Sequence, residues 1–149
     1  MRDHTYRAGT LPTRGASEGS GAYHNPNVKD DKMGRLTTHV LDTVAGIPGH
    51  GMSIALHKIV NNQRETLKRL VTNHDGRADA PLLEGDALVP GVYELEFGAG
   101  DYFRAQGVKL PEPAFLDVVT LRFGIADAGA HYHVPLLVSP WSYSTYRGS

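Results

Sequence analysis

From Leu36 onward, hydrophobic and polar residues alternate in short runs, and glycine, proline and asparagine separate these runs. Strand side chains point alternately to opposite faces, so such alternation predicts strands with one buried face. In the segment Met52–Val60, for example, Met52, Ile54 and Leu56 share one face. The predicted strands, in chain order, are Leu36–Thr43, Met52–Val60, Glu65–Thr72, Val92–Phe97, Ala114–Gly124, His131–Val138 and Ser142–Tyr146.

Turn signals separate the strands, and one segment has a helical pattern. The run Asn73-His74-Asp75-Gly76 is a strong turn signal. Asp101–Gln106 is the predicted helix, with Asp101 as a candidate N-cap and Gly107 as the residue that closes it. Many short strands at this spacing predict an all-β fold, an antiparallel sandwich of about seven or eight strands.

The first 32 residues differ in composition from the rest. They are rich in Gly, Ser, Thr, Asp and Arg and contain almost no aliphatic residues. Such a segment buries too little apolar area to offset its ordering entropy, so residues 1–32 are predicted to be a disordered extension. Residues 33–149 then form a single domain, as expected for a chain of 149 residues.

Composition narrows the functional classes. A net charge of −1 gives no electrostatic case for nucleic acid or an anionic membrane as a partner. The sequence contains no cysteine, so disulfides, thiol nucleophiles and cysteine-ligated zinc are excluded. No apolar run is long enough for a membrane-spanning helix. We also see no export signal, and the cytoplasm is therefore the default prediction for the compartment.

The histidine strand His131–Val138 is the most informative segment. His131 and His133 lie two residues apart and share one face, while the apolar residues of the strand take the other. The histidine pair therefore points out of the core, into solvent, a cleft or a subunit interface. Pro135 within this strand indicates an edge or a bulge.

Three chemical readings of these residues stay open on the sequence alone. A His-x-His strand can bind zinc with His39 as a third ligand, it can supply a general base, or it can have no functional role. His39 by itself is more often an ordinary strand histidine. Arg77, which follows Asp75-Gly76, is either a solvated arginine beside a turn or a rigidly held group that grips a carbonyl or oxyanion.

Five segments, taken together and in order, resemble the 5-hydroxyisourate hydrolase family, the transthyretin-related enzymes of urate breakdown. The resemblance covers about residues 33–149, and the terminal Tyr-Arg-Gly-Ser is its most specific part because it separates the hydrolases from the transthyretin hormone carriers. The segments are Leu36–Thr43, Asp75–Arg77, Gly100–Phe103, His131–Leu137 and Tyr146–Ser149.

The resemblance implies a fold, an assembly and an activity. The fold is a transthyretin-like sandwich of two four-stranded antiparallel sheets with one short helix. The assembly is a homotetramer, a dimer of dimers around a channel that holds the active sites. The activity is hydrolysis of 5-hydroxyisourate to 2-oxo-4-hydroxy-4-carboxy-5-ureidoimidazoline in purine catabolism, without a cofactor. Two departures are the extension 1–32 and Trp141-Ser142, where the family usually has Phe or Tyr followed by Gly.

The resemblance also assigns site residues. The family's catalytic groups fall on His39, Arg77, His133 and Ser149, and the groups that bind substrate or shape the pocket fall on His131, Tyr146 and Arg147. We expect His133 to act as the general base, His39 to orient the water or share its proton, and Arg77 to stabilise the developing oxyanion. The alternatives are a non-catalytic transthyretin-like carrier, a zinc-dependent hydrolase that uses His39, His131 and His133, and a purely structural sandwich module.

Overall fold

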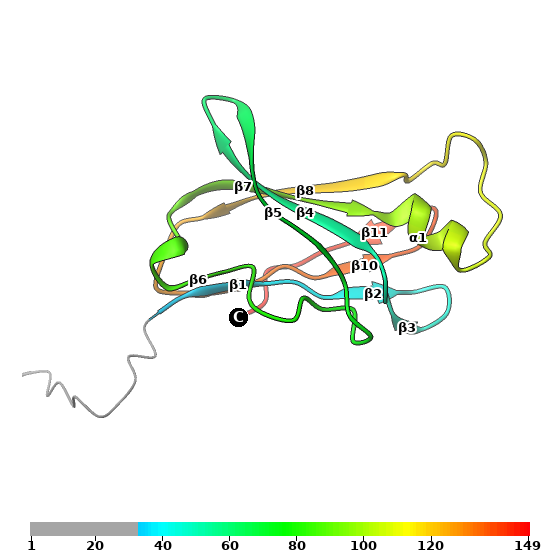
Figure 1. The fold of residues 1–149 in the computed structure, drawn as a ribbon, viewed down its shortest axis with the longest axis horizontal. Helices are drawn as coiled ribbons and strands as arrows, with labels where there is room; N and C mark the ends of the chain where they lie inside the picture. Colours follow the sequence, from blue (N-terminus) through cyan, green and yellow to red (C-terminus); the bar gives the residue numbers. More distant parts are fainter. Residues whose placement is uncertain (1–32) are drawn as a thin grey trace, which may run out of the picture.

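The computed structural model describes residues 33–149, and the predicted disordered extension 1–32 lies outside the described residues. Nearly all of its regular elements are strands (Figure 1). The elements in chain order are β1 (Arg35–Thr37), β2 (Val40–Asp42), β3 (Ile47–Pro48), β4 (Ser53–Val60), β5 (Gln63–Val71), β6 (Leu83–Glu84), η1 (Gly85–Ala87), β7 (Gly91–Gly98), α1 (Ala99–Ala105), β8 (Val118–Ile125), β9 (His131–His133), β10 (Leu136–Val138) and β11 (Tyr143–Ser144).

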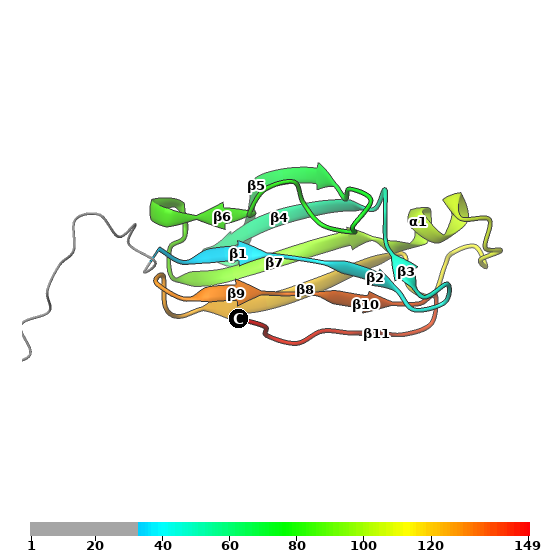
Figure 2. The same cartoon turned by 90° about the horizontal axis from the view of Figure 1, so that it is seen from below.

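The strands form two layers, as the sequence predicts for a transthyretin-like sandwich. One layer is a continuous antiparallel sheet in the order β5-β4-β7-β8. The other layer consists of two shorter ladders, β6-β1-β9 and β11-β10-β2-β3. Figure 2 shows this second layer face on, with β1 leading into β2 and β9 leading into β10 alongside.

The second layer is divided because its two long strands are interrupted at the same level. The predicted strand Leu36–Thr43 breaks at Thr38, and the predicted strand His131–Val138 breaks at Pro135, which has no N–H to donate. Val134 N still donates to Thr37 O at 2.9 Å, so the two strands stay together across the break. These strands run parallel, β1 with β9 and β2 with β10, whereas we expected antiparallel neighbours throughout.

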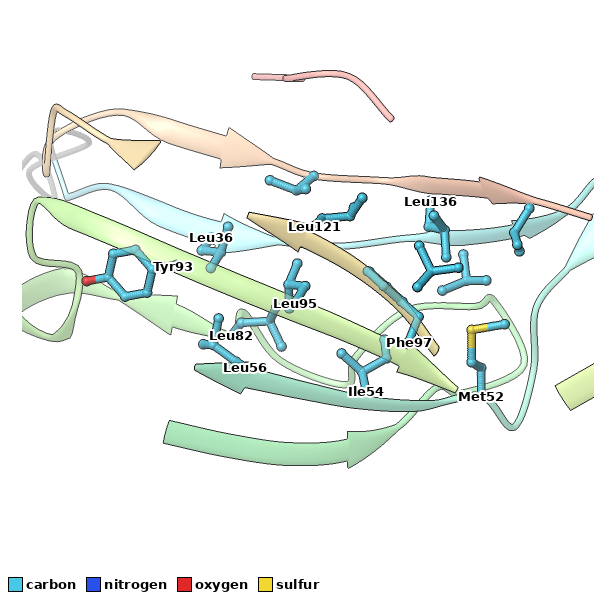
Figure 3. Packing of buried hydrophobic residues seen from close by; sticks show 14 of the residues in the cluster. Leu36, Met52, Ile54, Leu56, Leu82, Tyr93, Leu95, Phe97, Leu121 and Leu136 are labelled. Atoms are coloured by element: carbon cyan, nitrogen blue, oxygen red, sulfur yellow. The ribbon is translucent and has the colours of Figure 1, made fainter. Parts of the chain in front are cut away.

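The core lies between the two layers (Figure 3). Leu36 from the second layer and Leu56, Leu95 and Phe97 from the first are fully buried there. Their neighbours along each strand face the other way, as the alternation predicts, although in the middle of β4 and β7 several of these neighbours are buried as well. In β1 only Leu36 is buried. The polar face of the second layer is therefore left free for the candidate site.

The helix begins two residues earlier than the sequence predicts. α1 starts at Ala99 with Gly98 at the N-cap, so Asp101 lies in the first turn and the prediction of Asp101 as the cap is wrong. Gly107, with φ of +85°, follows the C-cap Gln106 as a left-handed residue, as predicted.

The predicted strand Ala114–Gly124 begins only at Val118 in the structure. Asp117 O accepts a hydrogen bond from Gly100 N at 2.9 Å, so the residues before β8 are held against the start of α1 instead of joining the sheet. Within residues 33–149, no helix is long and apolar enough to cross a membrane.

Candidate active site

One polar cavity lies on the outer face of the second layer, beside β1 and β9. Its volume is about 300 Å³, which is at the small end of the range for small-molecule sites. The lining contains histidine, arginine and hydroxyl side chains but no Asp or Glu side chain. The lining residues are Arg35, Thr37, Arg77, His131, His133 and Ser149.

The register of β1 against β9 places four of these side chains together. Arg35 pairs with His131 and Thr37 pairs with His133 in the parallel ladder. The intervening residues Leu36 and Tyr132 point into the core, so the four polar side chains share the outward face. His131 and His133 are both half-buried, which agrees with the prediction that the pair points out of the core.

Arg77 reaches this face from the predicted turn. Gly76 adopts a φ of +73°, a backbone conformation that favours glycine, and its carbonyl accepts a hydrogen bond from Val40 N at 2.8 Å. This contact brings Arg77 opposite His39 in an isolated antiparallel bridge. No ion pair within residues 33–149 involves Arg77, so its guanidinium is available to a ligand.

His39 lies beside the cavity and is not part of its lining. Burial lowers the pKa of His39, and the positive charge of Arg77 lowers it further; the backbone and carboxylate of Asp75 act in the opposite direction. The imidazole is therefore biased toward its neutral form near neutral pH.

His133 has the environment expected of a general base. Its Nδ1 lies 2.8 Å from the hydroxyl oxygen of Thr37. Burial lowers the pKa of His133, and the charges of Arg77 and His39 lower it further. A neutral imidazole in a cavity that also holds a guanidinium can accept a proton from water while the arginine stabilises negative charge on oxygen.

The C-terminal segment docks on the histidine strand. His133 and Gly148 exchange two backbone hydrogen bonds, from Gly148 N to His133 O at 2.7 Å and from His133 N to Gly148 O at 3.1 Å. The Thr145 hydroxyl donates to Pro135 O at 2.7 Å. This docking places Ser149 in the lining of the cavity.

The structure places Tyr146 and Arg147 outside the cavity lining. Both face an adjoining groove that runs along β8. The Arg147 guanidinium lies 4.5 Å from the centroid of the Tyr132 ring and donates to His131 O at 3.4 Å. Arg147 thus supports the histidine strand, and the side chain of Tyr146 is exposed.

The three histidines of the zinc hypothesis do not come together as a ligand set. Within residues 33–149, no group of three or more His, Asp or Glu side chains has an arrangement that could hold a metal ion. His131 and His133 line the cavity, whereas His39 lies to its side.

Two lining residues, Arg35 and Thr37, are absent from the sequence-based site assignment. The signal that could have identified them is the period of two, since they occupy alternate positions before His39 on the same strand. Their proximity to His131 and His133 depends on the parallel pairing of β1 with β9, which alternation alone does not reveal.

Known proteins match this chain over the whole described part. Residues 36–148 match the family model described as HIUase/Transthyretin family. The chain is 75% identical over 117 residues to the 5-hydroxyisourate hydrolase of Ralstonia nicotianae, which covers 78% of this chain and 100% of that relative. It is 65% identical over 117 residues to the 5-hydroxyisourate hydrolase of Pseudomonas aeruginosa, covering 78% of this chain and 93% of that one.

A solved structure of (S)-allantoin synthase superimposes with a TM-score of 0.75 at 48% identity, and the match covers 78% of this chain and 44% of that chain. The present chain thus spans less than half of that protein. The segment that the family model matches, residues 36–148, contains every strand of the sandwich apart from the first residue of β1, and every residue of the cavity except Arg35 and Ser149. The chain belongs to the HIUase/transthyretin family.

Proposed function

We propose that this protein hydrolyses 5-hydroxyisourate at the cavity formed by β1, β9, the Arg77 turn and the C-terminal segment. The observation that carries the proposal is the convergence of Arg77, His133 and Ser149 on one cavity, with His39 alongside. A relative that is 75% identical to this chain is named 5-hydroxyisourate hydrolase, and the proposed substrate is taken from that name.

His133 is the proposed general base. The reaction opens a cyclic amide: water adds to the ring carbonyl, the C–N bond breaks, the nitrogen leaves with a proton and a carboxylate forms. A neutral histidine that takes the proton of the attacking water typically contributes about 10²–10⁴-fold. His133 suits this step because burial, Arg77 and His39 all lower its pKa.

Arg77 is the proposed oxyanion group. The carbonyl oxygen gains negative charge when water adds, and a guanidinium without a protein carboxylate partner can donate two hydrogen bonds to it. His39 lies opposite Arg77 and orients the water or shares its proton. Ser149 adds a hydroxyl at the rim of the cavity for substrate or water. His131, Tyr146 and Arg147 bind substrate or support the pocket.

We infer that the protein assembles as a homotetramer, a dimer of dimers in which this face of the second layer lines a channel. Large apolar side chains remain exposed on the second layer and its loops in one subunit, including Trp141 at 61% and Val44 at 60%. Apolar side chains of this size usually become buried in an interface. The face with the cavity is open in a single subunit, and a neighbouring subunit would close it over the substrate.

A transthyretin-like carrier is the alternative function. An apolar channel for an aromatic ligand has no need of two arginines, two histidines and two hydroxyls around one cavity. The polar lining therefore favours hydrolysis. A ligand carrier would bind the substrate or an aromatic analogue without accelerating its decay.

The test uses urate, urate oxidase and the purified protein. Ultraviolet absorbance follows the decay of freshly generated 5-hydroxyisourate with and without the protein. Accelerated and stereoselective ring opening is the expected result, and it should survive prolonged chelation because no step uses a metal. Loss of activity on chelation, with recovery on adding zinc, would favour the zinc-dependent hydrolase instead. No acceleration by a confirmed tetramer would favour the carrier.

A further inference from the structure

The imidazole of His133 is held on two sides by residues outside the assigned catalytic set. On one side, Nδ1 lies 2.8 Å from the hydroxyl oxygen of Thr37. This is the only side-chain hydrogen bond of His133 within the described residues 33–149. Thr37 is the register partner of His133 in the parallel ladder, so the backbone of β1 fixes the position of the hydroxyl.

On the other side, Gly148 packs against the ring edge. A Cβ atom at Gly148 would lie 3.0 Å from His133 Cβ and 3.1 Å from His133 Cδ2. The backbone of Gly148 is tied to His133 by both hydrogen bonds of the isolated bridge. With Nδ1 bound to Thr37 and Cδ2 covered by Gly148, the ring edge that contains Nε2 is left for the cavity.

We propose that Thr37 is a positioning residue for His133: its hydroxyl accepts the hydrogen on Nδ1, so that Nε2 faces the cavity as a bare acceptor. A neutral imidazole has one donor nitrogen and one acceptor nitrogen, and the bond made by one nitrogen selects the role of the other. Only an unprotonated Nε2 can take a proton from water. The inference rests on the proposed hydrolysis, and it names the group that prepares His133 for it.

The charges around the cavity favour this tautomer. A threonine hydroxyl can donate or accept a hydrogen bond, so the surroundings of His133 determine which of the two roles Thr37 takes. The charged and titratable groups that face His133 are Arg35 from β1, His131 from β9, Arg77 from its turn and His39 between β1 and β2. Positive charge on the arginines attracts the Nε2 lone pair and repels an Nε2 hydrogen. Nδ1 therefore carries the hydrogen and donates it to Thr37.

The direct test is nitrogen-15 NMR of the full chain, labelled at histidine, without substrate and near neutral pH. The His133 signals, assigned by their loss in His133→Ala, should show a protonated Nδ1 and an unprotonated Nε2. The opposite tautomer would overturn the proposal. This measurement does not depend on turnover, so it distinguishes failure of the tautomer from failure of the proposed hydrolysis.

The kinetic test compares Thr37→Val with Thr37→Ser. Removing the partner of the second nitrogen of a metal-bound histidine typically costs about 10–100-fold, and we expect a loss of this order in kcat for Thr37→Val with KM little changed. Thr37→Ser keeps the hydroxyl and should recover most of the rate. The matched control is Thr43→Val, because the Thr43 hydroxyl donates to Val138 O at 3.1 Å, away from the cavity.

The pH profile of Thr37→Val adds a second readout. The bond to Thr37 stabilises the imidazolium more than the neutral ring, because a charged donor makes the stronger hydrogen bond. Its loss should therefore shift the acid limb of kcat to lower pH. A shift to higher pH would mean that Thr37 donates to Nδ1, which would overturn the proposal.

Gly148→Ala is the second variant, in case Thr37→Val perturbs the strand. The backbone of Gly148 is not left-handed, so alanine is compatible with it, and the added methyl would press on the His133 ring. We expect a drop in kcat with an unchanged circular dichroism spectrum. Wild-type kcat in this variant would contradict the inference that Gly148 helps to hold the His133 ring in position.

Discussion

His39 and Arg77 face each other in an isolated antiparallel bridge, although one belongs to the first long strand and the other to a turn. The positive charge of Arg77 is the second cause, after burial, that lowers the pKa of both His39 and His133. Arg77 therefore has two proposed effects: it stabilises negative charge on the substrate oxygen, and it keeps two neighbouring imidazoles neutral.

Replacing Arg77 by Gln should lower kcat and move the pH profile. The loss of one oxyanion donor typically costs about 10²–10³ in rate. Without the positive charge, the pKa values of His39 and His133 rise, so the acid limb of kcat/KM should move to higher pH. The profile between about pH 5 and 8 measures both effects. An acid limb at its wild-type position would contradict the electrostatic role of Arg77.

Two further arginine variants sharpen that comparison. Arg77→Glu should abolish hydrolysis and leave a folded tetramer, because it places a negative charge where the oxyanion develops. Arg69→Gln is the control, since Arg69 lies exposed on β5 in the other sheet and contributes nothing to the cavity. Near wild-type turnover in Arg77→Glu would remove this residue from the mechanism.

His133 and His131 should differ in their importance. His133→Ala removes the proposed base and should reduce kcat by about 10²–10⁴-fold. His131→Ala should have a smaller effect that falls mainly on KM, because the proposed role of His131 is to bind substrate. His74→Ala, on an exposed turn, is the control. Steady-state kinetics of the three variants provides the measurement, and equal losses in His131→Ala and His133→Ala would contradict this division of roles.

The period of two in the sequence was sufficient to predict the two central strands of the first layer. The strands β4 and β7 match the predicted segments closely, because large apolar residues recur at every second position on the face that packs in the core. The break of the histidine strand at Pro135 could also be anticipated, since proline has no N–H for the ladder. The break of the first strand at Thr38 could not, because Thr38 is a good strand residue whose hydroxyl finds Val134 O at 2.8 Å.

The site was harder to predict than the fold. Alternation shows that His131 and His133 share a face, but it says nothing about which other residues lie opposite. Arg77 is brought there by a turn that contains the left-handed Gly76. A hydrogen bond between residues far apart in the sequence, from Val40 N to Gly76 O, holds this turn against the first long strand. The resemblance to the hydrolases suggested Arg77, whereas Thr37 was identified only from the structure.

Tyr102→Phe should destabilise the fold without affecting the cavity. The Tyr102 hydroxyl of α1 donates to the buried Asp42 carboxylate at the end of β2, at 2.8 Å. Burial, the hydrogen bond to Asp42 and the Asp42 charge all raise the pKa of Tyr102, so it stays a donor. Leaving a buried carboxylate oxygen without its partner costs about 1–3 kcal/mol.

Urea unfolding at fixed protein concentration measures this cost as a lower midpoint at constant slope. Tyr143→Phe is the matched control, because within residues 33–149 the Tyr143 hydroxyl makes no hydrogen bond and its side chain is 45% exposed. Equal midpoints for the two variants would show that the contact between α1 and β2 adds nothing to stability.

A chain that starts at Met33 should retain full activity and assembly. The family model matches residues 36–148, and the Ralstonia nicotianae relative is matched along its whole length by 117 residues of this chain. The composition of residues 1–32 gives them little apolar area to bury in an interface. Kinetics and light scattering on the full and shortened chains measure both properties. A changed rate or a dissociated tetramer in the shortened chain would show that the extension contributes to the site or to the subunit contacts.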